Sequence, residues 1–558
     1  MKLYRIITVL AASLLAFAAC SEIDEVVPAS GSLLESQVIE TNAADETRGA
    51  ASFNGLYTYL GKPNNPLGGS VRPDCYSFIM ITFCDDLEGA DAWIQNNNYN
   101  WFSVCGELSS RNANYRNPGV RYKSPYDLIG LCNTFIQSYP PIAEIESASS
   151  KAMVAQAYAL RAFAYQRLAI NFSFGPTIAP DALCVPIVTP ETEDYSNNPR
   201  ATTKEVYDLI LSDLNIAVEN LDGYVRPDKS RINKTAALAL RARTYLAMGE
   251  WDKAYDDAAA VIAAGAAEGI APKTVAEIKS SVKDGTAFQS LAEKDWIWGY
   301  DMTDVIASAY DVATSSSWIR SFSAESYSWW CQTYTCINTL LYDKIPATDV
   351  RKQWWVDENL KSDLIEGIVW SGPGGTDVPI AEYADDDKTT FLPYTNVKFG
   401  CNPIGTIVND EDFPFIRIDE MYLIEAEAKA HSSEAAAALI LANYVKTYRD
   451  PAYVVTGRTN VLLDEIWFQR RVELWGEGFF TFDMKRLGKP LVRFHASGAN
   501  KGNQPDAFAF NLAADDAWLN MRFSQGELDT NHGIVDNTGS EQPKPGQNPN
   551  LTDGVTDY

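Results

Sequence analysis

The stretch Ile232–Ala264 places the tightest constraint on how this 558-residue chain can fold. Ala242 and Tyr245 lie on one helical face and precede a turn at Gly249. Trp251 then opens a second helical stretch. Small side chains at the crossing points and an aromatic ring after the turn are what antiparallel helix pairs need in order to stack. The stretch therefore predicts a tetratricopeptide-like unit with neighbours of the same kind.

Helical periodicity recurs in three further parts of the chain. The plainest example is Lys151–Phe172, where Met153 and Leu160 return to one face among small alanines that allow close helix contact. The expected helix pairs cover 51–138, 151–220, 232–264 and 418–480. We therefore predict a mainly α fold, in which about four tetratricopeptide-like helix pairs form a superhelical scaffold over about 51–264 and 411–488.

Between residues 265 and 410 the character of the sequence changes. Helical periodicity weakens, Gly, Ser, Asp and Pro become frequent, and eight of the 14 tryptophans occur here. This predicts a large loop-rich, aromatic-rich insertion between the third and fourth helix pairs. Within it, Trp296–Tyr300 alternates rings and is expected to be a strand with one buried face. Residues 489–558 are predicted to form an extended C-terminal segment of the same single domain, 49–558.

The N-terminal residues predict the compartment. Positive charges at Lys2 and Arg5 precede an apolar run that is too short for a membrane span, so residues 1–19 are predicted to be a secretory signal peptide. The run ends in L-A-F-A-A-C, which resembles a lipoprotein signal-peptidase site. Cys20 would then carry the lipid, and the polar, acidic stretch 20–48 would be a lipidated tether. The alternative is an ordinary cleavage that leaves an unmodified thiol at Cys20.

Charge and composition exclude several classes of partner. The net charge of −27 argues against nucleic acid, since a phosphate backbone would be repelled and no cluster of Lys and Arg appears. With three scattered histidines and no C-x-x-C pair, the sequence predicts no metal site and no cofactor. Apart from Cys20, the eight cysteines are expected to be mostly buried thiols, although Cys331 and Cys336 could pair in an oxidising compartment.

Catalytic motifs are scarce. No G-x-S-x-G sequence is present, so Ser/His/Asp catalysis is not expected. Glycoside hydrolysis needs two carboxylates roughly 5–10 Å apart, and Asp85, Asp86 and Glu88 are the best candidates. Neither this cluster, which continues to Asp91, nor Asp385–Asp387 has the pattern of a calcium loop. Both are interpreted as solvated faces or as hydrogen-bonders to sugar.

Two helical stretches near the end of the scaffold combine rings with charges. In the first, Ile418 and Tyr422 belong to a core-facing stripe. The acids expected to lie off that stripe are Asp419, Glu420 and Glu427. In the second, Arg470 lies beside Glu473, with Glu477 one turn further on. So many neighbouring aromatics predict a partly buried structural network, with a catalytic pair as the alternative.

Two long sequence motifs in these stretches closely resemble those of the SusD/RagB-like family of outer-membrane lipoproteins. They are R-x-D-E-x-Y-L-x-x-A-E-A at Arg417–Ala428 and R-R-x-E-L-x-G-E-G-x-x-x-x-D-x-K-R at Arg470–Arg486. Glu527–Asn531 resembles the closing E-x-x-x-N of the family. The motif residues, for which we expect a structural role, are Arg417, Glu420, Tyr422, Glu427, Arg470, Arg471, Glu473, Glu477, Asp483 and Arg486.

This resemblance implies an architecture and a partner. Members are helical and tetratricopeptide-like, are anchored by lipid (including palmitate) in the outer membrane facing the cell exterior, and bind glycans or other nutrients. They hold the ligand for a SusC-like TonB-dependent transporter. The helices at 151–172 and 232–264 would then face that transporter. No enzymatic activity is implied.

Two ring-rich stretches are the predicted ligand site. Flat rings suit sugars because the C–H faces of a pyranose stack on them, and the family takes its ligand contacts from loops between early helices and from the long insertion. The glycan-binding candidates are Trp93, Asn97, Tyr99, Trp101, Trp318, Tyr327, Trp329 and Trp330. The alternative is that these rings fill the core of the insertion.

The leading prediction is thus a non-catalytic, surface-exposed glycan-binding lipoprotein. A peptide-binding uptake lipoprotein of the same architecture is the main alternative, and a glycoside hydrolase is a more distant one.

Overall fold

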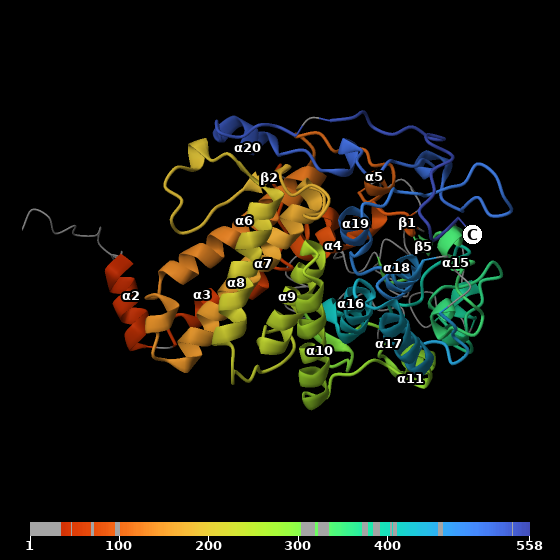
Figure 1. Cartoon of the computed structure of the whole chain (residues 1–558), viewed down its shortest axis with the longest axis horizontal. Coiled ribbons are helices and arrows are strands. Elements are labelled where there is room, and N and C mark those ends of the chain that lie inside the picture. The colour runs from red at the N-terminus through yellow and green to blue at the C-terminus, as the bar shows by residue number, and fades with distance from the viewer. Residues whose placement is uncertain are drawn as a thin grey trace, which may run out of the picture.

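The computed structural model describes residues 35–45, 47–68, 72–94, 101–302, 319–321, 334–370, 378–382, 391–401, 404, 410–455, 461–537 and 539–557. Within these residues the chain is mainly helical, as predicted, and its strands form three two-stranded ribbons. Figure 1 shows helices across the left and centre of the molecule and irregular segments gathered on the right.

The helices of the first half are α2 (Glu35–Ala44), α3 (Ala50–Thr58), α4 (Ser77–Leu87), α5 (Ser103–Gly106), α6 (Arg116–Gln137), α7 (Ala148–Phe172), α8 (Thr203–Asn220), α9 (Lys234–Met248) and α10 (Trp251–Ala267). Those of the second half are α11 (Val275–Asp284), α15 (Thr339–Tyr342), α16 (Ile418–Ala430), α17 (Glu434–Tyr448), α18 (Leu462–Glu473), α19 (Phe480–Arg486) and α20 (Gln525–Thr530). The antiparallel ribbons are β1 (Ala92–Ile94) with β5 (Thr335–Ile337), β2 (Leu183–Pro186) with β3 (Arg200–Thr202), and β4 (Trp296–Tyr300) with β6 (Phe413–Arg417).

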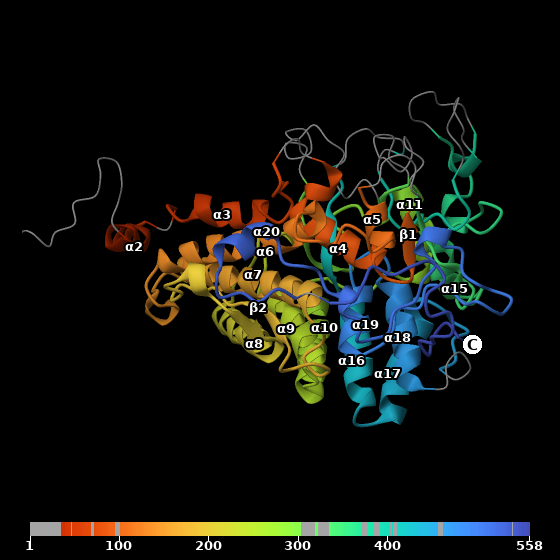
Figure 2. The same ribbon diagram turned by 90° about the horizontal axis from the view of Figure 1, so that it is seen from above.

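The scaffold is a row of helices, each packed on the next: α6, α7, α8, α9, α10, α16 and α17. Gly249 ends α9 in the left-handed conformation at φ +71°, which turns the chain directly into α10. Helix α10 then packs on α16, although the whole insertion separates them in sequence. Figure 2 shows α8, α9, α10, α16 and α17 along one side of the molecule. The insertion is therefore looped out of a continuous helical row.

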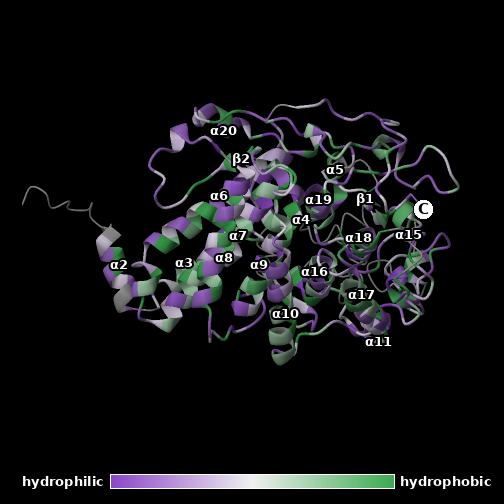
Figure 3. Ribbon diagram, in the orientation of Figure 1, coloured by the Kyte–Doolittle hydropathy of each residue, from purple (hydrophilic) through white to green (hydrophobic). Residues whose placement is uncertain are grey.

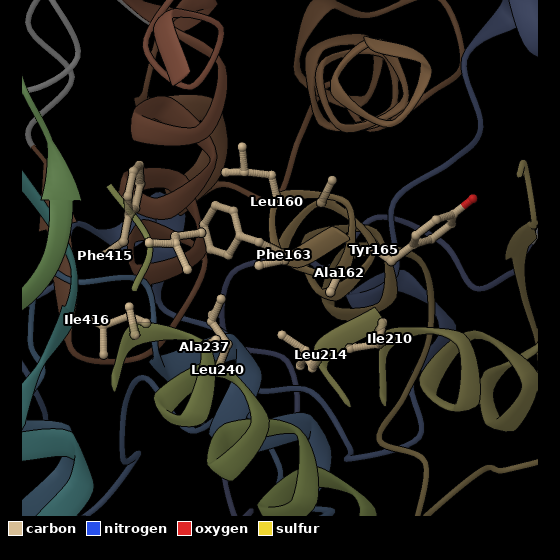
Figure 4. Packing of buried hydrophobic residues seen from close by; sticks show 14 of the residues in the cluster. Leu160, Ala162, Phe163, Tyr165, Ile210, Leu214, Ala237, Leu240, Phe415 and Ile416 are labelled. Atoms are coloured by element: carbon tan, nitrogen blue, oxygen red, sulfur yellow. The ribbon is translucent and has the colours of Figure 1, made fainter. Parts of the chain in front are cut away.

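Helix α7 forms the centre of the first core. Its Phe163 ring lies 4.9 Å from the ring of Trp298 in β4 and 5.3 Å from that of Phe415 in β6. Figure 4 shows Leu160 and Phe163 of α7 beside residues of α8, α9 and β6. Burial of side chains of this size contributes about 1.5–3 kcal/mol each. Because α7 is buried along most of its length, the expectation that it faces a partner is wrong.

The insertion builds a second core. Trp296, Trp354, Trp355 and Trp370 are at most 2% exposed and belong to it, together with rings of α18. Trp298 is buried in the first core. These five tryptophans are therefore core residues. Figure 3 shows apolar residues both in the helical rows and in the irregular half of the molecule.

Local patterns misplaced several elements. In the sequence the helical period is clear only over Pro125–Ser138, but α6 begins at Arg116, because buried polar residues in its first turns hide the apolar period. The stretch Cys84–Trp101 has the mix of carboxylates, amides and rings that is typical of a loop, but Cys84 lies in α4. Strand β4 is buried on both faces, since its five residues are all enclosed between the two cores. Part of the expected tether is helical in α2, where Asn42 donates to the carbonyl oxygen of Ser138 at 3.0 Å.

The described cysteines are buried free thiols, as expected. Cys331 lies outside the described residues, so its pairing with Cys336 stays a prediction. Among the helices that the structure describes, none combines the length and apolarity needed to cross a bilayer.

Charged residues of the two motifs meet in a buried network. The guanidinium of Arg417 donates to Glu477 at 2.8 Å and to Glu473 at 3.1 Å. Glu473 also accepts from Arg449 at 2.7 Å and from Arg351 at 3.3 Å, and its side chain is fully buried. Burial opposes the charge on Glu473, but the guanidiniums of Arg449 and Arg417 outweigh it and hold the pKa of this carboxyl well below its ordinary value.

The predicted pairing within this network was wrong in detail. Arg470 does not pair with Glu473 and instead donates to Asp483 at 2.8 Å, because the chain turns back through α19. The acids expected off the core stripe of α16 are also buried: Asp419 pairs with Arg449, Glu420 with Arg243 and Glu427 with Arg486. Arg471 pairs with Asp91 and Asp553. Tyr422, placed on the core face, is partly exposed.

We expect Glu473→Ala to lower the free energy of unfolding by about 3–5 kcal/mol, because it leaves buried guanidiniums without a carboxylate. Urea denaturation followed by circular dichroism would measure this. The control is Asp208→Ala, which removes an exposed pair with Lys204 and should change the stability little. Equal stability of the two variants would contradict a structural role for Glu473.

Candidate functional site

One ribbon pairs described residues that adjoin the two ring-rich stretches, Trp93–Trp101 and Trp318–Trp330, in the sequence. In the pairing of β1 with β5, Ile94 lies opposite Thr335 and Trp93 opposite Cys336. Because the ribbon is antiparallel, the chain that follows Ile94 and the chain that precedes Thr335 leave it at the same end. The ribbon therefore pairs two segments, Ala92–Ile94 and Thr335–Ile337, that lie more than 200 residues apart in the sequence.

Asn396 fastens this end of the ribbon. Its side-chain amide donates to the carbonyl oxygens of Ile319 at 2.9 Å and of Thr335 at 3.3 Å. Its backbone N–H also donates to the oxygen of Thr335, at 3.0 Å. Thus one buried asparagine holds described residues on both sides of the second ring-rich stretch.

Arg320 anchors residues 319–321, at the start of the second ring-rich stretch. Its side chain is fully buried. Its guanidinium donates to the backbone carbonyls of Phe288, Gly400 and Asp412, at 2.8, 2.6 and 2.8 Å. Its Nε also lies 3.8 Å from a carboxylate oxygen of Glu411. These contacts fix residues 319–321 on the insertion core.

Trp93 is held in the second core. It is 8% exposed and packs among the buried residues of the insertion and α18. Its indole Nε1 has no hydrogen-bond partner in the described part of the chain. A ring this deeply buried offers little surface for stacking. The predicted contact between Trp93 and a ligand is not tested by this burial and stays a prediction.

Trp101 lies in a different environment. It is partly exposed, and the guanidinium carbon of Arg72 lies 5.5 Å from its ring centroid. Arg72 in turn donates through Nε to Asp74 at 3.0 Å, which fixes the cation over the ring. A partly exposed indole with a restrained orientation is suited to stacking on a sugar.

The other predicted contacts lie outside the described residues. They are Asn97, Tyr99, Trp318, Tyr327, Trp329 and Trp330. Cys20 and Asp385–Asp387 also lie outside them. The roles of all these residues stay predictions.

The acids of α4 are not solvated, contrary to expectation. Arg121 of α6 donates to Asp85 at 2.6 Å and to Glu88 at 2.8 Å. Asp86 accepts from the backbone N–H groups of Gly478 and Phe480 at 3.0 and 3.1 Å, and burial raises its pKa to about 7. Sequence reasoning missed this because the cations come from distant helices.

A raised carboxyl pKa is a common property of catalytic acids. Here the cavity beside Asp86 measures about 10 Å³, which is at the lower limit for one water molecule. A sugar cannot enter this cavity, and Asp85 and Glu88 are also buried, at 0% and 6% exposed. Among the described residues, no group of His, Cys, Asp and Glu side chains is arranged to hold a metal ion.

Two protein-family models match the chain. The model described as "Starch-binding associating with outer membrane" matches residues 76–246, and the model described as "SusD family" matches residues 312–539. The first match contains Trp93 and Trp101, and the second contains Trp318–Trp330. Both ring-rich stretches thus lie within the matched residues.

Individual relatives agree with these matches. SusD-like protein P38 of Formosa agariphila is 23% identical over 406 residues, which are 66% of this chain and 71% of the relative. A solved SusD-like carbohydrate binding protein from Bacteroides vulgatus is 25% identical with a TM-score of 0.69, over 89% of this chain and 98% of that one. A solved structure called a laminarin-binding SusD-like protein is 20% identical with a TM-score of 0.57, over 89% and 100%.

We expect Trp93→Ala and Trp101→Ala to differ in stability. Removing the buried ring of Trp93 leaves a cavity and should lower the free energy of unfolding by about 3–5 kcal/mol. The same change at the partly exposed Trp101 should lower it clearly less. Urea titrations of the two matched variants would test this, and equal losses would show that Trp101 is as much a core residue as Trp93.

Proposed function

Since the chain belongs to the SusD/RagB family of carbohydrate-binding, outer-membrane-associated proteins, we propose that it captures an oligosaccharide or polysaccharide at the cell surface and delivers it to a SusC-like TonB-dependent transporter. The observation that supports the proposal is the β1–β5 ribbon, which pairs Ala92–Ile94, at the start of the first ring-rich stretch, with Thr335–Ile337, which follow the second in the sequence. Loops held on a rigid frame are where binding residues are usually found.

Ring stacking and hydrogen bonds would share the binding. A stacked aromatic ring contributes about 1 kcal/mol, and amide side chains such as Asn97 would bond the sugar hydroxyls. In the sequence Trp101 lies seven residues after Ile94, and Trp330 lies five residues before Thr335. A relative of the same fold is called a laminarin-binding protein, so laminarin is the first ligand to test.

The protein would bind its glycan without cleaving it. The candidate carboxylates for hydrolysis are Asp85, Asp86 and Glu88. All three are engaged in buried hydrogen bonds or ion pairs. A binding role needs only the rings and amides of the surface loops.

The attachment to membrane and partner forms the second half of the proposal. Cys20 would carry the lipid, and residues 20–48 would connect it to the body. The transporter would meet the helical row through the outer faces of α8 and α10, whose solvent-facing residues include Asp208 and Asp256. The buried α7 is not available for this contact.

At least one of the variants Trp101→Ala, Trp318→Ala and Trp329→Ala should lose tenfold or more in glycan affinity, about 1.4 kcal/mol, with little loss of stability. Isothermal titration with laminarin and a glycan array on the chain from Ser21 onwards would measure this. The matched control is Trp251→Ala, whose ring stacks on His431 at 3.6 Å and should not contact the ligand. Normal binding by all three variants would contradict the proposed surface.

Cys20→Ala should remove the protein from the outer-membrane fraction, because one substitution deletes the only proposed attachment. Fractionation of cells that lack the partner transporter would give the answer. The matched control is Ser21→Ala, which keeps the cysteine and should stay in the membrane. Wild-type membrane retention of the Cys20 variant would show that the anchor lies elsewhere.

A further inference from the structure

A cleft of about 790 Å³ lies between α6, residues 186–198 and α20. In Figures 1 and 2 the helices α6 and α20 lie well away from β1. Neither Trp93 nor Trp101 lines the cleft. The cleft therefore does not include the described rings of the ligand surface proposed above, and its volume is within the range of about 300–1,000 Å³ that is usual for ligand sites.

Four tyrosines line the cleft. Tyr122 and Tyr126 of α6 lie side by side, with ring centroids 4.6 Å apart, and Tyr122 is buried. At the rim, Tyr115 is 47% exposed and Tyr195 is 60% exposed. Large exposed rings around a concave surface are typical of binding sites, because a protein surface without a partner seldom leaves them together in water.

Hydrogen bonds hold one wall of the cleft on α6. Asn133 donates to the carbonyl oxygen of Val188 at 3.1 Å, and Gln137 donates to that of Pro190 at 3.2 Å. The hydroxyl of Tyr126 donates to the carbonyl oxygen of Pro186. The segment 186–190 is thus fastened to one helix by three side chains.

The other wall is tied in the same way. Asn531 donates through Nδ2 to the carbonyl oxygen of Asn198 at 2.7 Å, and its Oδ1 accepts from the N–H of Asn198 at 2.9 Å. Glu527 in turn accepts from Asn531 at 2.8 Å. Glu527 and Asn531 are the first and last residues of the closing E-x-x-x-N motif. Because both walls are already ordered, a ligand would lose little affinity to the ordering of the protein.

Charge narrows the ligand class. The charged residues that line the cleft are Lys123 and Glu527. Lys123 is neutralised by Asp127, at 2.6 and 2.7 Å from its two carboxylate oxygens. An anionic ligand would therefore meet no unpaired cation among the lining residues. The remaining polar groups are amides and hydroxyls, which together with flat rings match the hydroxyls and C–H faces of a neutral sugar.

We propose that this tyrosine cleft, lined by Tyr115, Tyr122, Tyr126 and Tyr195, is a second carbohydrate site that takes a short stretch of neutral oligosaccharide. The inference rests on the proposed function and deepens it. Two separated sites on one chain would hold a long glycan at two points, which raises the apparent affinity for a polysaccharide above that for a short fragment.

Isothermal titration with a panel of neutral gluco-, manno- and xylo-oligosaccharides, laminarin fragments included, tests the proposal. We expect two sites on the wild-type chain. The double variant Tyr115→Ala/Tyr195→Ala should lose tenfold or more at one of them, and Trp101→Ala should weaken the other. The matched control is Tyr115→Phe/Tyr195→Phe, which keeps both rings and should keep both sites. Leu439→Ala, at an exposed position on α17, controls for surface changes elsewhere.

Each outcome decides between the two proposals. If the wild-type chain binds sugar at a single site and the double tyrosine variant keeps that site, the proposal for the tyrosine cleft is wrong and the proposed function still stands. A single site that is lost in this variant and kept in Trp101→Ala supports the cleft. Failure of the wild-type chain to bind any member of the panel overturns both proposals. Binding of a tryptic peptide mixture, but of no sugar, at the cleft overturns its assignment as a carbohydrate site. If the double variant has a lowered melting temperature, Tyr195→Ala alone takes its place.

Discussion

The buried ion pairs around Arg417 and Glu473 join the two halves of the molecule. Arg417 lies at the junction of β6 and α16, and Glu473 lies at the end of α18. The insertion contributes Arg351 and Lys398, which pair with Glu473 and Glu477. A buried charge without a partner is costly, by several kcal/mol. The scaffold and the insertion must therefore dock in one arrangement, because any other would leave charges unpaired in the core.

This docking fixes the described residues that adjoin the proposed ligand surface. Once the insertion is fixed, Asn396 donates to the carbonyl oxygens of Ile319 and Thr335, and Arg320 donates to that of Asp412. Strand β5 then pairs with β1 from the early part of the chain. The same logic applies to the tyrosine cleft, where Asn531 ties the C-terminal segment to residue 198. Buried polar contacts thus make the frame beside both proposed surfaces rigid.

Periodicity was a good guide to helices with one apolar face and a poor guide to buried charge. The helix pair around Gly249 and the helix at Lys151–Phe172 could be predicted because their apolar and small residues recur with the period of a helix. Asp85, Glu88 and Asp419 carry charges that on a surface would face water. In the fold each meets a guanidinium, so local pattern assigned them to the wrong environment.

The sequence by itself determined the helical scaffold, the position of the insertion, the family and the two ring-rich stretches, since each is expressed in residues that are close together along the chain. Only the tertiary structure decided which charges are buried, that Trp93 belongs to a core while Trp101 is partly exposed, and that a tyrosine-lined cleft exists at all. The physical reason is the distance between partners. Arg471 and Asp91 are 380 residues apart, and no local pattern can pair them.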